Sequence, residues 1–405
     1  MAKKTLGLSI IVKNEEHVIE RMLSTIYPIL DYYTVVDTGS TDNTKEVIKK
    51  FFEEKGIPGQ ILDKPFDNFE NCRNYAMDAC RDKTDYSMWI DADEELILSD
   101  DFDKNKLDKD LYMITTNIGA MRYTRNELWS NKKKFKWYGP VHEYIIPVDR
   151  NITSGIAEGL EVNVHMDGGS WKEGSVAQKY KKHADMLEEY IIKDRNPRWV
   201  FYTAQSWHDS ATSTSRSENN ERLRRSLRYY QERVESNDGY FEERYYAQYR
   251  VGLIKKMLEE SWGDVQGELL KAYSIDPKRG ESIKVIIEYY QKIGEWNLAY
   301  LYSSFAHENF HNNSPYPERL LFVDESLYVW RFLELHLNSL FYLKRISEAQ
   351  TAARELLSLI QSNPGAFKDA DKQRISNNAS RIMSVAPPKK SPMLNKTDEA
   401  MNLKV

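Results

Sequence analysis

Cysteine is scarce in this chain, which has two cysteines, Cys72 and Cys80, among its 405 residues. Two cysteines cannot form the disulfide framework that holds many small secreted domains together. Their positions place both on the apolar side of one predicted helix, where a free cysteine packs as a small hydrophobic residue. We therefore expect two core residues in a protein of the reducing cytoplasm.

Long apolar runs are missing too, because no stretch reaches the ~18 residues that a membrane-spanning helix needs. The first apolar stretch, residues 6–12, is interrupted at once by Lys13-Asn14-Glu15 and is too short for a signal peptide. The net charge of -5 argues against a general nucleic-acid binder. These absences predict a protein without a membrane span and without a broad affinity for nucleic acids.

Two nucleotide-binding motifs are also absent. The first predicted strand–helix loop lacks GxGxxG, and GxxxxGK[ST] occurs nowhere in the chain. The sequence therefore has neither the dinucleotide-binding fingerprint nor a P-loop. Without a glycine-rich first loop to hold a triphosphate, a nucleotidyltransferase is disfavoured as well.

The first half of the chain alternates between strand and helix patterns. Apolar, β-rich stretches predict strands at 6–12, 33–36, 60–63 and 86–90. Segments with apolar residues at helical spacing lie between them, and Asn14 is expected to cap the first helix. This alternation predicts an α/β domain with a mostly parallel sheet and right-handed crossovers.

Carboxylates gather where two of these strands end. The second predicted strand ends at Asp37, and the fourth runs directly into four acidic residues, beginning with Asp91 and Asp93. Because open α/β sheets bind ligands at the carboxyl ends of their strands, we expect these side chains on one edge. Four like charges so close together repel one another unless a cation joins them. The pattern indicates a divalent ion that links carboxylates to substrate phosphates.

Five short motifs follow one another along the first part of the chain, each at the end of a predicted element. They are Ser9-Ile10-Ile11-Val12-Lys13-Asn14-Glu15-Glu16, Val35-Val36-Asp37-Thr38-Gly39-Ser40-Thr41-Asp42, Cys72-Arg73-Asn74-Tyr75-Ala76, Asp91-Ala92-Asp93-Glu94 and Trp137-Tyr138-Gly139-Pro140-Val141-His142-Glu143. In this order they resemble family 2 glycosyltransferases of the GT-A fold. The chain is most similar to the subgroup with helical repeats behind the catalytic domain, which includes the bacteriocin S-glycosyltransferases. The resemblance covers about residues 6–170 motif by motif and extends more loosely to about 360.

The resemblance implies a nucleotide-sugar site, with a UDP-sugar as the expected donor. The residues implied to contact the donor are Val12, Asn14, Asp37, Arg73 and Asp91. Asp37 would contact the uracil and ribose, and Asp91 the ribose hydroxyls. Many family members carry a second acid where this chain has Thr38, so the base contact is expected to be weaker or differently arranged.

The same resemblance implies the metal site and the catalytic residues. Asp93 would bind the Mn²⁺ or Mg²⁺ ion that holds the two phosphates, and His165 is a candidate for a further ligand. An imidazole beside carboxylates suits Mn²⁺ better than Ca²⁺. Glu143 lies about where inverting enzymes of this fold place the base that takes the acceptor proton. His142 competes for that role, or would orient the leaving phosphate. Residues 168–171 after His165 are expected to form a mobile lid.

From about residue 175 the strand pattern ends, and aromatic residues recur at helical spacing. Pairs of amphipathic helices in units of roughly 34 to 45 residues are similar to tetratricopeptide (TPR) repeats. We therefore divide the chain into a GT-A domain (1–170), a TPR-like helical domain (175–365), and a last helix with a disordered tail (366–405).

These features favour an inverting, metal-dependent glycosyltransferase whose helical array holds a macromolecular acceptor or forms a homodimer. A glycan or polypeptide acceptor ranks above DNA, because the net negative charge disfavours DNA. Two alternatives stay open. The chain could be a catalytically inactive scaffold with a repeat-mediated binding surface, or a glycosyltransferase acting on modified DNA bases. The intact acids Asp91, Asp93 and Glu143, with His165, speak against the scaffold.

Overall fold

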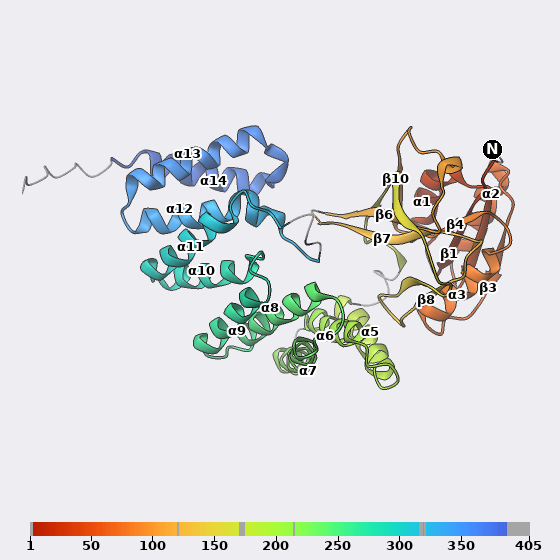
Figure 1. The fold of residues 1–405 in the computed structure, drawn as a ribbon, viewed down its shortest axis with the longest axis horizontal. Coiled ribbons are helices and arrows are strands. Elements are labelled where there is room, and N and C mark those ends of the chain that lie inside the picture. Colours follow the sequence, from red (N-terminus) through yellow and green to blue (C-terminus); the bar gives the residue numbers. More distant parts are fainter. Residues whose placement is uncertain are drawn as a thin grey trace, which may run out of the picture. The chain divides into compact units, whose positions relative to one another are not determined.

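The computed structural model describes residues 3–119, 121–169, 175–213, 215–315, 319 and 321–386. The chain divides into two compact units (Figure 1). The first unit comprises Met1–Asp276 with Tyr316–Val323, and the second comprises Pro277–Pro315 with Asp324–Val405. No helix within the described ranges is both long enough and apolar enough to cross a membrane.

The first unit is built on an eight-stranded sheet with the order β3-β2-β1-β4-β7-β6-β10-β5. Its strands are β1 (Leu6–Val12), β2 (Tyr32–Asp37), β3 (Gly59–Asp63), β4 (Tyr86–Met88), β5 (Glu94–Leu98), β6 (Leu111–Ile118), β7 (Met121–Ser130) and β10 (Ser154–Val164). The pairs β3–β2, β2–β1, β1–β4 and β6–β10 are parallel. The pairs β4–β7, β7–β6 and β10–β5 are antiparallel. The predicted α/β class with a largely parallel sheet is confirmed.

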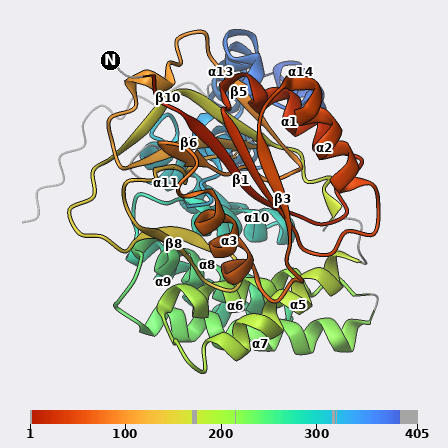
Figure 2. The ribbon, with the colours of Figure 1, turned by 90° about the vertical axis from the view of Figure 1, so that its right-hand side faces the viewer.

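Alternation along β1 explains how helices cover both faces of the sheet. The even-numbered residues from Leu6 to Val12 are buried and pack with α1 (Ile19–Ile26) and α2 (Thr44–Lys55). On the other face, a Cβ at Gly7 would lie 3.0 Å from Cys80 Sγ, at the end of α3 (Phe69–Cys80). Figure 2 shows α3 across the sheet from α1 and α2. Each fully buried aliphatic side chain here stabilises the fold by roughly 2 kcal/mol.

A small second sheet carries the last of the five motifs. Strands β8 (Phe135–Tyr138) and β9 (Tyr144–Pro147) pair antiparallel, with Gly139 to Glu143 in the loop between them. Asn74 of α3 fixes this hairpin, because its Oδ1 accepts from Trp137 N at 2.8 Å and its Nδ2 donates to Trp137 O at 3.0 Å. The loop is thereby held against α3.

The described residues from 175 onward are mainly helical, as predicted. The first unit contains α5 (Val176–Tyr190), α6 (Pro197–Asp209), α7 (Arg216–Glu235), α8 (Phe241–Met257) and α9 (Trp262–Ile275). The second unit contains α10 (Glu281–Ile293), α11 (Trp296–Phe310), α12 (Phe332–Tyr342), α13 (Ile346–Ser362) and α14 (Asp369–Met383). Local signals set the ends: Asn196 caps α6 ahead of Pro197, and Gly294 ends α10 in the left-handed conformation.

Packing joins the sheet to the first helices. Helices α5 to α9 belong to the same compact unit as the sheet, and the division between units follows Asp276. The predicted boundary near residue 170 marks a change of secondary structure inside this unit, and the predicted domain limits stay a prediction. Residues 387–405, which include the predicted disordered tail, lie outside the described residues.

Candidate active site

The predicted acidic edge lies in the turn between β4 and β5. Trp89 N donates to Glu127 O of β7 at 3.0 Å, which prolongs the β4–β7 pairing by one bond. The carboxylate of Glu94 then accepts from Asp91 N at 3.0 Å. These bonds fix the backbone that carries Asp91 and Asp93.

Arg73 of α3 joins two of the predicted site residues. Its Nε donates to Glu143 Oε1 at 2.6 Å, and its Nη2 donates to Asp91 Oδ1 at 2.7 Å. The guanidinium lies 4.7 Å from the ring centroid of Trp89 and 4.9 Å from that of Trp137. The Arg73 side chain is 7% exposed and that of Glu143 is 10% exposed, so the charge-assisted bond between them is shielded from water, whereas Asp91 is partly exposed. Arg73 therefore holds Asp91 and Glu143 side by side.

The two carboxylates on this guanidinium differ in proton affinity. Burial raises the pKa of Glu143, and the attraction of Arg73 offsets only part of that rise. Burial acts on Asp91 as well, but Arg73 and Arg125 hold its pKa below the usual value. Asp91 therefore stays ionised at neutral pH, whereas Glu143 is the better proton acceptor.

A second buried ion-pair group also contacts Trp89. Arg125 of β7 binds Glu94 through two bonds of 2.9 Å, and it also pairs with Glu127. Its guanidinium lies 4.8 Å from the Trp89 ring, so Trp89 contacts both Arg125 and Arg73. Glu127 is fully buried, and burial raises its pKa to about 8.

The segment after β10 lies across the acidic edge and contacts Asp93. Gly168 N donates to Asp93 Oδ2 at 3.2 Å, and Gly169 N donates to Glu15 Oε2 at 2.8 Å. A Cβ at Gly168 would lie 3.0 Å from Asp93 Cγ, and one at Gly169 would lie 2.7 Å from two backbone oxygens of the β1–α1 loop. The close approach to the backbone therefore requires glycine at 169, and a side chain at 168 would need Asp93 to shift. The remainder of the predicted lid, Ser170 and Trp171, lies outside the described residues.

Negative charge accumulates beneath this segment. Burial and repulsion from Asp91 raise the pKa of Asp93. Burial raises the pKa of Glu15 to about 7, against the opposing effect of the bond from Gly169, and the charges of Asp93 and Asp91 add to the rise. Carboxylates with raised pKa values are stabilised by an added cation. Hard oxygen ligands of this kind fit Mn²⁺ or Mg²⁺.

His165 lies beside Asp93 through its backbone, while its ring faces another acid. His165 N donates to Asp93 O at 3.2 Å, and His165 Nε2 lies 2.9 Å from Glu95 Oε2. In the part of the chain that the structure describes, no three His, Cys, Asp or Glu side chains converge in a way that could hold a metal ion. The metal-binding role of His165 stays a prediction.

Asp37 ends β2 and organises the turn that follows. Its Oδ1 accepts from Gly39 N and Ser40 N, both at 2.9 Å, and the residue is 2% exposed. Its buried Oδ2 has no hydrogen-bond partner among the described residues. Asn14 lies against this turn, because its Oδ1 accepts from Thr41 N at 2.8 Å. Asp37 thus combines a turn-forming oxygen with a buried oxygen left for another donor.

The first strand–helix loop departs from the sequence prediction at Asn14. The prediction that Asn14 caps α1 is wrong, since α1 begins at Ile19 without a side-chain cap and Asn14 bonds to Thr41. The carbonyl of Val12 accepts from Thr38 N at 2.9 Å and from Thr38 Oγ1 at 3.1 Å. The threonine that replaces the family's second acid therefore links β2 to β1.

His142 points toward the helices rather than to Arg73. Its φ is 54°, and its ring stacks on Tyr202 of α6 with centroids 4.2 Å apart. The ring of His183 of α5 lies 6.2 Å away, edge to face. Burial, with the nearby positive charges, lowers the pKa of His142 to about 3, so its imidazole is neutral at pH 7. Helices α5 and α6 therefore line the candidate site where His142 lies.

The structure thus brings Arg73, Asp91 and Glu143 into one hydrogen-bonded group beside Asp93. His165 contacts Asp93 only through the backbone, and His142 faces α5 and α6. Sequence reasoning missed the residues that support this group. They are Glu15, Trp89, Arg125, Glu127, Lys179 and Tyr202. Glu15 stands within the first motif and could have been found, whereas the two helical residues carry no local signal.

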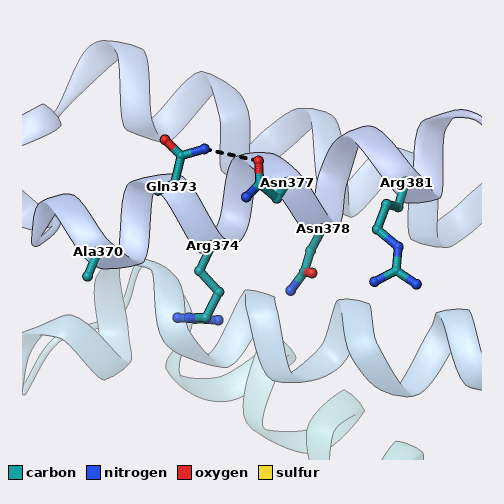
Figure 3. A pocket seen from close by; sticks show the side chains of 6 residues that line it. All are labelled: Ala370, Gln373, Arg374, Asn377, Asn378 and Arg381. Carbon is teal, nitrogen blue, oxygen red and sulfur yellow. Dashed lines mark hydrogen bonds between the residues drawn. The ribbon is translucent and has the colours of Figure 1, made fainter.

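A separate polar pocket lies on α14 of the second unit (Figure 3). It is lined by Ala370, Gln373, Arg374, Asn377, Asn378 and Arg381. Gln373 Nε2 donates to Asn377 Oδ1 at 3.0 Å, and Arg374 pairs with Glu334 of α12 and with Asp371. These contacts fix α14, and none of the predicted site residues lines this pocket.

The described structure combines an α/β domain, aspartates at the carboxyl edge of its sheet and a buried carboxylate–arginine group beside them. Residues 8–100 match the family model described as Glycosyl transferase family 2. Four of the five motifs lie within the matched residues, so the predicted resemblance to a family 2 glycosyltransferase domain is confirmed over this part of the chain.

Three curated relatives share parts of the chain. Over 219 residues it is 25% identical to the SPbeta prophage-derived glycosyltransferase SunS of Bacillus subtilis, covering 50% of this chain and 49% of that protein. An uncharacterized glycosyltransferase of Rickettsia typhi is 33% identical over 93 residues, 23% of this chain and 29% of its own. A TPR repeat-containing protein of Synechococcus elongatus is 29% identical over 153 residues, 36% of each chain. The chain spans about half the length of SunS and less of the other two.

Two solved structures are similar at a distance. S. aureus TarS has a TM-score of 0.34 at 11% identity, covering 68% of this chain and 56% of that chain. The mannosyltransferase PcManGT from Pyrobaculum calidifontis, in complex with GDP-Man and Mn²⁺, has a TM-score of 0.33 at 11% identity, covering 68% and 87%. Likenesses this weak do not bear on function.

Proposed function

We propose that this chain is an inverting, metal-dependent glycosyltransferase that moves a sugar from a UDP-sugar to a macromolecular acceptor, either a glycan or a polypeptide. The observation that carries the proposal is the Arg73 group, because it holds an ionised Asp91 and a buried, more basic Glu143 beside Asp93. The family 2 match over residues 8–100 supports the same reading. Acceptor class, homodimer formation and a cytoplasmic location stay predictions.

Each part of the site has a role in this proposal. Asp37 accepts a hydroxyl or N–H of the nucleoside on its buried Oδ2, with Val12 and Asn14 bordering the base. Asp93 would hold Mn²⁺ or Mg²⁺, and the ion would supply positive charge to neutralise the diphosphate. Glu143 takes the proton of the acceptor as the acceptor attacks the anomeric carbon. Arg73 fixes the positions of Glu143 and Asp91 relative to each other through its two hydrogen bonds.

Substitution of Asp93 by asparagine tests the enzyme proposal directly. The wild-type protein, incubated with a panel of nucleotide sugars and Mn²⁺, should hydrolyse or transfer at least one donor and gain thermal stability from it. Asp93→Asn keeps the bond from Gly168 but loses the charge, so its turnover should fall by about 10²- to 10³-fold. Exposed Asp101→Asn is the matched control. If no donor stabilises the wild type, or if the two variants respond alike, the proposal fails.

Substitution of His165 by alanine tests the predicted metal ligand. If the ring leaves Glu95 and joins the ion, His165→Ala should raise the Mn²⁺ concentration needed for half-maximal activity by about 10-fold. Saturating Mn²⁺ should restore most of the turnover. Glu95→Gln separates the two roles, because it removes the partner seen in the structure and leaves the imidazole in place. An unchanged Mn²⁺ requirement in His165→Ala removes this residue from the metal shell.

A further inference from the structure

Helix α5 turns one face toward the candidate site, although it lies outside the family 2 match. A capping box fixes its first turn: Gln178 N donates to Ser175 Oγ at 3.2 Å, and Ser175 N donates to Gln178 Oε1 at 2.9 Å. Lys179 follows directly, and His183 lies one turn later on the same face. The His183 ring is 6.2 Å from His142 and 6.4 Å from Phe69 of α3. This face of α5 is therefore directed at the loop that carries Glu143.

The charge of Lys179 acts on the acidic edge of the sheet. Burial lowers the pKa of Lys179, and the negative charges of Asp93, Asp91 and Glu15 oppose that shift. The charge of Lys179 contributes to the lowered pKa of His183. Asp91 is already paired with Arg73, whereas Asp93 and Glu15 accept from backbone N–H groups. Lys179 is thus the cation that α5 directs to these acids.

We propose that Lys179 binds the nucleoside diphosphate as it leaves, so that the helical region supplies part of the catalytic apparatus. The inference rests on the proposed function. In the reaction, the acceptor forms a bond to the anomeric carbon while the bond from that carbon to the diphosphate oxygen breaks. The acceptor proton passes to Glu143, and the electron pair of the broken bond stays on the diphosphate.

The released diphosphate gains a charge that Lys179 can neutralise. A nucleotide sugar carries about two negative charges on its diphosphate, and the free diphosphate approaches three, because the second pKa of a terminal phosphate is ~6. An ammonium group on the face of α5 that is directed at this loop can pair with phosphate oxygens of the product. An interaction that strengthens as the bond breaks lowers the barrier rather than KM. Lys179 should therefore discriminate between product and donor.

The test compares two ligands on matched variants of the full chain. UDP and the donor found in the panel are titrated with Mn²⁺ into wild type, Lys179→Met, Lys179→Arg and the control Lys182→Met, an exposed lysine on the same helix. Lys179→Met should weaken UDP binding about 10-fold and donor binding less than about 3-fold, and should lower kcat about 10²-fold. Lys179→Arg should restore most of the UDP affinity. Lys182→Met should match the wild type.

The affinities and kcat of Lys179→Met distinguish the proposed role of Lys179 from general damage to the site. Equal UDP and donor affinities in Lys179→Met and wild type, with unchanged kcat, overturn the role of Lys179 while the glycosyltransferase proposal stands. Equal losses for UDP and donor also overturn it, since they indicate general damage to the cleft. If the wild type binds no nucleotide sugar, the proposed function itself fails. Should Lys179→Met not fold, Lys179→Gln is measured in its place.

Discussion

Glu143→Gln is expected to lower kcat by about 10³-fold while the affinity for the donor stays within a few-fold of wild type. Glutamine keeps an oxygen that can accept the bond from Arg73 Nε, which is 2.6 Å long in the wild type, so the loop should hold its place. It cannot take a proton, and general-base catalysis typically contributes 10²- to 10⁴-fold. Steady-state kinetics and donor titration on the same preparations measure the two quantities separately.

Substitution of the neighbouring His142 tests which of the two residues is the base. His142→Asn removes the competing base, and its effect on kcat should be smaller, because an imidazole with a pKa of about 3 accepts a proton poorly. Glu161→Gln on β10, whose carboxylate pairs with Arg122, is a control for the loss of one negative charge. A collapse of donor affinity in Glu143→Gln would instead assign this residue to the donor site. A larger loss in His142→Asn would assign the base to His142.

Arg73→Met is expected to destabilise the fold and to abolish turnover together. Methionine fills part of the space between Trp89 and Trp137 but leaves Asp91 and Glu143 without their cation. Removing one partner of a buried ion pair costs about 3–5 kcal/mol of unfolding free energy. Asp91 is 37% exposed, so water compensates part of its loss and the lower end of that range applies. Urea unfolding at pH 8 measures the change.

The pH dependence of the lost stability in Arg73→Met separates the contribution of charge from that of packing. Without Arg73, Glu143 and Asp91 can relieve their repulsion by taking up protons, and the raised pKa of Glu143 makes it the first to do so. The difference in stability between wild type and Arg73→Met should therefore narrow as the pH falls from 8 toward about 5. A difference that stays constant would assign the loss to packing against the two tryptophans. Arg73→Lys, which keeps the charge but cannot make two directed bonds, should recover stability while kcat stays low and KM changes little.

Much of the fold could be predicted because its signals are local. The apolar, β-rich stretch of β1 indicated a strand, and the alternation with helices indicated parallel neighbours. The carboxylates after β4 stood out as a dense acidic cluster at a strand end. The cap of α1 was predicted wrongly, because Asn14 bonds to Thr41 across the β2 turn, and a bond between separate loops leaves no trace in helical periodicity.

The sequence by itself determined the α/β domain, the helical region and the family 2 motifs, because strand and helix patterns and short motifs depend on neighbours along the chain. Only the tertiary structure decided how the site residues are paired. Arg73 could have been a surface arginine, yet it is buried between Asp91 and Glu143. The ring of His165 faces Glu95, and Lys179 acts on the acidic edge from α5. Such pairings depend on which distant elements pack together, and burial then makes each unpaired charge costly enough to fix its partner.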